Sequence, residues 1–147
     1  MSRHLFLSVR PEFTEKILTR VKTTEFRRTK PRVRVGQPVI IYASSPTMAI
    51  VGTARVRSVT TGSPTALWRQ FRHVGGIGRD RLREYFRGAE LGHAICLECV
   101  APLESAMTLR EIRSALPGFQ PPQAFIYLST CQVASLGLLA GSEAIRS

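Results

Sequence analysis

Three ionisable residues stand close together in the segment KTTEFRR at positions 22–28, where Lys22, Glu25 and Arg27 combine one carboxylate with two cations. A surface built only to attract polyanions gains nothing from such an acid, because the carboxylate cancels part of the positive field at short range. Either Glu25 is an incidental surface charge in an ion pair worth under about 1 kcal/mol, or it belongs to a polar site that needs both signs. In such a site the carboxylate accepts hydrogen bonds from a base while the cations hold phosphate or carbonyl oxygens.

The chain as a whole is strongly basic, since its 147 residues contain 21 Lys and Arg against 10 Asp and Glu. Residues 1–34 hold ten cations and three acids, and residues 55–87 hold eight arginines against two acids. Such an excess favours a polyanionic partner, and nucleic acid is the commonest one for a soluble domain. A compositional bias toward arginine is the alternative explanation.

The periodicity of the first half of the chain indicates which elements position these charges. Residues 4–9 predict a strand, and residues 11–21 predict a helix that begins at a proline. Residues 23–28 alternate in polarity, so Glu25 and Arg27 share one face of a short strand.

The next segments predict a β-hairpin. The run VIIYA at 39–43 is typical of a strand buried on both faces, and residues 48–59 alternate. This alternation places Arg55 and Arg57 together on the solvent face of the second strand.

The second half of the chain predicts two short helices, at 63–71 and 79–88, joined by the segment GGIG. A strand at 93–100 and a helix at 108–116 capped by Thr108 follow. The helical spacing of Trp68, Tyr85 and Phe86 favours core packing over base stacking. Residues 117–128 form a proline-rich segment with three aromatics.

Alternation of short strands with few crossover helices predicts an α+β fold, a small mixed β-barrel of about five to six strands with flanking short helices. The length indicates one domain over 1–147, with a core at 1–128 and a weakly helical C-terminal extension at 129–147. The apolar run LFLSV is too short for a signal peptide or a membrane span, so we expect a cytoplasmic protein without membrane contact.

The cysteine pair in CLEC, Cys96 and Cys99, invites a metal or redox interpretation. Side chains three positions apart on a strand point to opposite faces, so these two thiols cannot share a metal ion. We therefore expect buried thiols, no metal site and no cofactor.

The ordered set of motifs KTTEFR, VGQPVIIYASSP and AIVGTARV, followed by EYFRGAELGHAICL and PPQAFIYL, resembles the ASCH domains, a branch of the PUA-like β-barrel superfamily. The resemblance implies a cleft beside the helix that precedes the motif strand, and it implies RNA as the partner. Lys22, Glu25 and Arg27 fall on the family signature, and Ser44 and Ser45 fall on the loop expected to border the cleft. With the neighbouring cations, the expected binding residues are Lys22, Glu25, Arg27, Arg28, Lys30, Ser44, Ser45, Arg55 and Arg57.

These observations support three functional hypotheses. The first is a non-enzymatic RNA-binding domain in RNA processing or transcription regulation, with a polar cleft for a base, a nucleotide or a nucleotide-like small ligand. The second is a small hydrolase of a modified nucleoside or nucleotide, in which Lys22 and Glu25 exchange protons. One ASCH branch of amidohydrolases has a threonine nucleophile three residues after the lysine, where this chain has Glu25, so that mechanism does not transfer. The third is a regulatory module that senses a small ligand.

Overall fold

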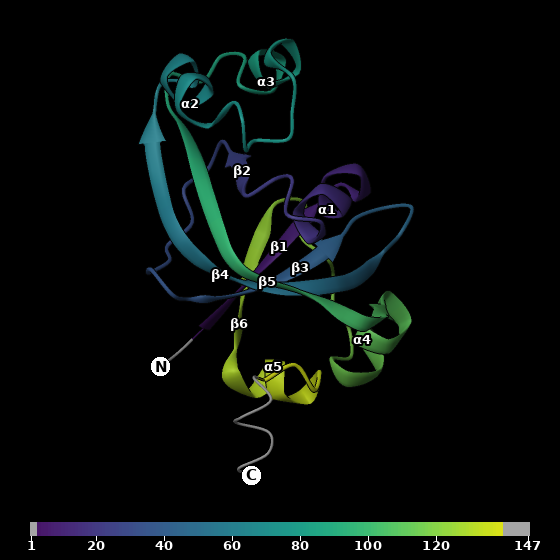
Figure 1. Cartoon of the computed structure of the whole chain (residues 1–147). Helices are drawn as coiled ribbons and strands as arrows, with labels where there is room; N and C mark the ends of the chain where they lie inside the picture. Colours follow the sequence, from purple (N-terminus) through teal and green to yellow (C-terminus); the bar gives the residue numbers. More distant parts are fainter. Residues whose placement is uncertain (1–2, 140–147) are drawn as a thin grey trace.

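Six strands form one mixed sheet in the computed structural model, which describes residues 3–139. The strands, in spatial order, are β2 (Thr24–Arg27), β5 (Gly92–Thr108), β4 (Ala49–Gly62), β3 (Pro38–Ala43), β1 (Arg3–Val9) and β6 (Phe125–Ser129). Strands β1 and β3 pair in parallel, and the other neighbours pair antiparallel. In Figure 1 the long strands β4 and β5 curve through the whole molecule.

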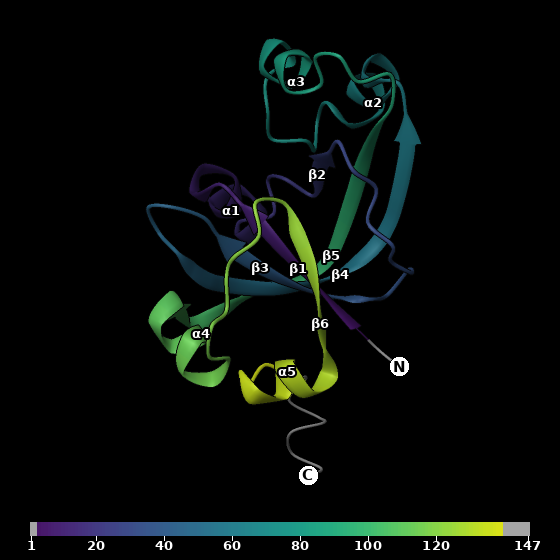
Figure 2. The same ribbon diagram turned by 180° about the vertical axis from the view of Figure 1, so that it is seen from behind.

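Five helices flank this sheet within residues 3–139: α1 (Pro11–Leu18), α2 (Pro64–Phe71), α3 (Arg79–Tyr85), α4 (Leu109–Ala115) and α5 (Thr130–Ser135). Helices α2 and α3 lie at the end of the molecule where β2 is found, and α4 and α5 lie at the opposite end (Figures 1 and 2). The predicted helix starts are confirmed, because Pro11 opens α1, Ser63 caps α2, and Thr108 forms a capping box with Glu111 at α4.

Strand β3 is buried on both faces, as predicted for VIIYA. Because side chains alternate along a strand, Val39 and Ile41 of β3 join one apolar cluster with α1, while Ile40 and Tyr42 join a second cluster with α4 and α5. A third cluster holds α2 and α3 against β2 and β5 through residues such as Phe26. The sheet is therefore packed against helices in three separate apolar clusters.

The predicted α+β class and strand number are confirmed, but the six strands form an open sheet because β2 and β6, at its two edges, do not pair within residues 3–139. The strand β6 lies in the segment that the sequence marks only as proline-rich. Its pairing with β1 gives it strand structure, although Pro121 and Pro122 lie just before it. The predicted weak helix after Ser129 is α5, and residues 140–147 of the predicted extension lie outside the described range.

Within residues 3–139, no helix has the length and apolar character needed to cross a membrane.

Candidate functional site

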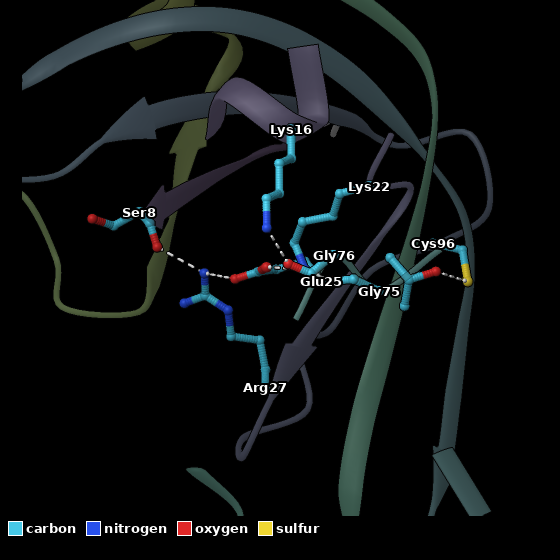
Figure 3. A network of polar contacts seen from close by, with 9 residues as sticks. Ser8, Lys16, Lys22, Glu25, Arg27, Gly75, Gly76 and Cys96 are labelled. Carbon is cyan, nitrogen blue, oxygen red and sulfur yellow. Dashed lines mark hydrogen bonds and ion pairs between the residues drawn. The ribbon is translucent and has the colours of Figure 1, made fainter. Parts of the chain in front are cut away.

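Lys22, just before β2, and Glu25 and Arg27, within β2, form one ion-paired cluster, shown in Figure 3. The Nζ atom of Lys22 lies 3.2 Å from Oε1 of Glu25, and Nη2 of Arg27 lies 2.6 Å from Oε2 of the same carboxylate. The three residues are 2%, 8% and 7% exposed, respectively. Glu25 is therefore no incidental surface charge, and each of its oxygens accepts from a different cation.

Burial and the neighbouring charges together set the pKa values of Glu25 and Lys22. Burial alone would raise the pKa of Glu25, but the charges and hydrogen bonds of Arg27 and Lys22 outweigh it and hold the pKa of this carboxyl below its usual value. Burial lowers the pKa of the Lys22 ammonium below its usual value, against the raising effect of Glu25. The carboxylate is thus ionised at neutral pH.

Lys22 is also held by the backbone and by aromatic rings. Its ammonium donates to the carbonyl of Gly75 and lies 5.1 Å from the ring centroid of Phe13 and 5.5 Å from that of Phe26. Cation–π contacts of this kind stabilise a desolvated ammonium. The segment GGIG does connect α2 to α3, as expected, but it also supplies this acceptor.

The side chain of Arg27 reaches from β2 to β1 and to the residue before β6. Its Nη2 donates to the carbonyl of Ser8 at 2.7 Å, and its Nη1 donates to that of Ala124 at 3.3 Å. Ser8 belongs to β1, and Ala124 directly precedes β6. One guanidinium therefore bridges the two edges that backbone pairing leaves apart.

A cleft of about 670 Å³ opens over this cluster. Its cationic lining residues are Arg10, Lys22, Arg27, Arg28 and Arg81, its carboxylates are Glu25 and Glu84, and its aromatic residues are Phe13, Phe26, Tyr85 and Phe125. The lining thus carries an excess of positive charge beside aromatic rings. This combination suits a nucleotide, whose phosphate binds cations and whose base stacks on a ring.

The structure brings only part of the predicted binding set to this cleft. Arg28 and Ser44 line it together with the ion-paired cluster, whereas Ser45, Lys30 and Arg57 do not. Arg55 lines a separate groove. The basic stripe on β4 is confirmed to be exposed.

Tyr85 lines the cleft and is 40% exposed, so the core assignment of this residue is wrong. Tyr85 is the last residue of helix α3, and Phe86 is its C-cap, at about 100° of rotation from it. Phe86 takes the buried position at 2% exposure. Burial raises the pKa of the Tyr85 phenol, and its hydroxyl stays protonated as a hydrogen-bond donor.

Arg81 connects helix α3 to helix α1 beside the cleft. Its guanidinium donates to both carboxylate oxygens of Glu12, at 2.6 and 2.8 Å, and it lies 4.9 Å from the ring centroid of Phe13. The partner guanidinium lowers the pKa of the exposed Glu12 carboxyl. This bidentate geometry fixes the wall of the cleft.

The cysteines of CLEC are less buried than predicted, because Cys96 is half-buried and Cys99 is exposed. Cys99 has a φ of 53°, and the register of β5 against β4 shifts in this region, so strict strand alternation does not apply. Among residues 3–139, no group of three or more His, Cys, Asp or Glu residues could hold a metal ion.

Comparison with known proteins places this fold in one class. The ASCH domain profile matches residues 7–106, and the chain belongs to the ASCH domain family, as the motif order predicted. The ASCH domain-containing ribonuclease of Zymomonas mobilis is 30% identical over 122 residues, which cover 83% of this chain and 82% of that protein.

Solved structures agree with this assignment. The crystal structure of ASCH from Zymomonas mobilis has a TM-score of 0.87 and 28% identity, covering 92% of this chain and 94% of that one. The human THYN1 protein, solved in complex with 5-methylcytosine-containing DNA, has a TM-score of 0.59 and 13% identity, covering 93% of this chain and 97% of its own. At that identity the likeness shows the fold alone.

The contact between the GGIG segment and Lys22 predicts that Gly76→Ala is destabilising. Gly76 has a φ of 63°, and an added Cβ would lie 2.8 Å from the Lys22 side chain. We expect a loss of about 1–3 kcal/mol in the free energy of unfolding, measured by urea denaturation. Gly78→Ala is the control, because no atom lies within 4 Å of its added Cβ. Equal stability of the two variants would contradict this packing.

The buried ion pairs predict that Glu25→Gln lowers the free energy of unfolding by about 3–5 kcal/mol near pH 7, because two buried cations lose their counter-charge. The folded pKa of Glu25 lies below the unfolded value of 4.5, so the stability it contributes is present above that pH and is lost as the pH falls through the folded pKa. The difference between variant and wild type should therefore shrink in acid. Glu104→Gln, at an exposed position, should stay within about 0.5 kcal/mol of wild type. A difference for Glu25→Gln that is constant with pH would contradict the assignment.

Proposed function

We propose that this protein binds single-stranded RNA and seats one nucleotide in the cleft above Lys22, Glu25 and Arg27. The observation that carries the proposal is the cleft lining, which combines an excess of cations with an exposed aromatic ring, Tyr85. A base can stack on such a ring only when it is not stacked within a duplex, which favours single strands. The relationship to an ASCH domain-containing ribonuclease supports RNA as the polymer.

Within this proposal the cations and the carboxylate have different roles. Arg27 and Arg28 attract the phosphate, since both line the cleft. Glu25 positions Lys22 and Arg27, which it contacts directly. Each carboxylate oxygen of Glu25 retains a second lone pair that can accept a hydrogen bond from the amine of a base.

The stacking role of Tyr85 predicts that Tyr85→Ala weakens binding of a fluorescent single-stranded RNA oligomer by about 1–3 kcal/mol. Leu91→Ala is the control, because Leu91 is also exposed but lies outside the cleft lining. Fluorescence anisotropy titrations at several salt concentrations measure both variants. Unchanged affinity of Tyr85→Ala, or no binding of the oligomer by wild type at low salt, would contradict the proposal.

Cleavage of the bound RNA is a second candidate function, favoured by the 30% identity to a ribonuclease over most of both chains. In the simplest such reaction the 2′-oxygen attacks the adjacent phosphorus, the bond to the 5′-oxygen breaks, and a proton moves from the first oxygen to the second. Negative charge develops on the phosphate oxygens, and fixed cations such as those of the cleft stabilise it. Among the cleft groups, Lys22 is suited to proton transfer because burial lowers its pKa.

The cleavage hypothesis predicts that Lys22→Met cuts a single-stranded RNA about 10²–10⁴-fold more slowly than wild type. Lys16→Met is the control, because Lys16 is exposed and donates to the neighbouring Gly76 carbonyl at 2.9 Å. Gel analysis of end-labelled substrate, with folding verified by circular dichroism, measures the rates. A parallel reaction with a chelator reports whether a divalent cation takes part. Equal rates for both variants, or equal cutting of a substrate with a 2′-deoxy nucleotide at the scissile position, would contradict this candidate.

A further inference from the structure

A second hollow of the molecule, distinct from the cleft, is lined by arginines, and within residues 3–139 no carboxylate lines it. This groove of about 860 Å³ is bordered by strands β1, β3 and β4 and by the loop between β2 and β3. Four of its lining residues are the exposed arginines Arg3, Arg32, Arg34 and Arg55. We name it the arginine groove.

No described carboxylate within residues 3–139 neutralises the four arginines. Among residues 3–139, none of them takes part in an ion pair, and no Asp or Glu lines the groove. Like charges gathered in one concave surface repel one another and concentrate the positive field. Such a surface is favourable to an extended polyanion, whose phosphates would neutralise several guanidinium groups at once.

Hydrogen bonds hold the loop that carries two of these arginines. The backbone N–H of Arg32 donates to the Tyr127 hydroxyl at 2.6 Å, and that of Arg34 donates to the Gln37 side chain at 3.0 Å. The Gln37 amide in turn donates to the carbonyl of Arg3 at 2.9 Å. A loop whose backbone is fixed in this way loses little further backbone entropy on binding.

The remaining two arginines are also held in place. The guanidinium of Arg3 lies 4.5 Å from the ring centroid of Tyr127, and Arg55 donates to the carbonyl of Gly36 at 2.8 Å. Both contacts leave further N–H donors for a ligand, since a guanidinium has five. The groove therefore has a fixed loop backbone and two guanidinium groups, those of Arg3 and Arg55, that are held by contacts.

The loop between β2 and β3 connects the groove to the cleft. Arg28 and Thr29 line the cleft, whereas Arg32 and Arg34 line the groove. Six residues of extended chain span at most about 20 Å, so the two sites lie within that distance along the loop. The exposed Lys30 lies between them.

We infer that the arginine groove binds the phosphate backbone of the same RNA strand whose nucleotide occupies the cleft, and that this loop guides the strand from one to the other. The inference rests on the proposed function and extends it from a single-nucleotide site to a longer binding path. A strand that reaches both sites should bind more tightly than one that fills the cleft alone.

The test is a salt titration of uridine oligomers of about 4–16 nucleotides against wild type and the double variant Arg32→Gln, Arg34→Gln. We expect the slope of log affinity against log salt for long oligomers to fall by about 1.4 in magnitude, from two phosphate contacts at about 0.7 each. Binding of uridine monophosphate, which fills only the cleft, should stay unchanged. Within residues 3–139 the side chains of Arg32 and Arg34 have no partner, so we expect the double variant to fold. An unchanged melting temperature should confirm this.

The matched control is Arg69→Gln, Arg72→Gln, which removes the same charge from exposed positions lining neither site. Equal salt slopes for the two double variants would overturn the groove assignment while leaving the cleft proposal intact. If the wild-type protein bound neither the oligomers nor uridine monophosphate, the proposed function would be overturned instead. Loss of binding to phosphatidylserine vesicles in the Arg32, Arg34 variant, with RNA binding unchanged, would assign the groove to an anionic membrane surface and overturn the inference.

Discussion

The carboxylate of Glu25 is the group on which the geometry of the site depends. It lies between Lys22 and Arg27, two cations that burial would otherwise make costly. With its charge in place, Lys22 can pack on the GGIG segment and Arg27 can reach the carbonyls of Ser8 and Ala124. The guanidinium of Arg27, which Glu25 holds in the floor of the cleft, thus also joins β2 to β1 and to the residue before β6.

The two hollows of the molecule differ in the chemistry they offer. The cleft mixes cations, carboxylates and aromatic rings, as needed to distinguish one polar group from another. The arginine groove offers positive charge alone, which attracts phosphate without regard to sequence. The loop between β2 and β3 lines both hollows, and it carries four of the ten cations of residues 1–34, namely Arg28, Lys30, Arg32 and Arg34.

Local patterns predicted much of this structure, and long-range contacts account for what they missed. Alternation placed Glu25 and Arg27 on one face, and a capping residue located helix α4 at Thr108. No local pattern could show that Arg27 bonds to a carbonyl 97 residues away, because that contact depends on how β1 and β6 meet. The helical spacing also missed the exposure of Tyr85, because Phe86, the C-cap of α3, takes the buried position instead.

The position of β1 between β3 and β6 constrains the order in which the protein can fold. Strand β1 is made first, yet one of its two neighbours, β6, pairs Ser129 with Arg3 near the far end of the chain. Nearly the whole domain must therefore emerge from the ribosome before the sheet is complete, and contacts so distant in sequence form slowly. Until then the edge of β1 that pairs with β6 stays unpaired, and an unpaired strand edge is prone to aggregation.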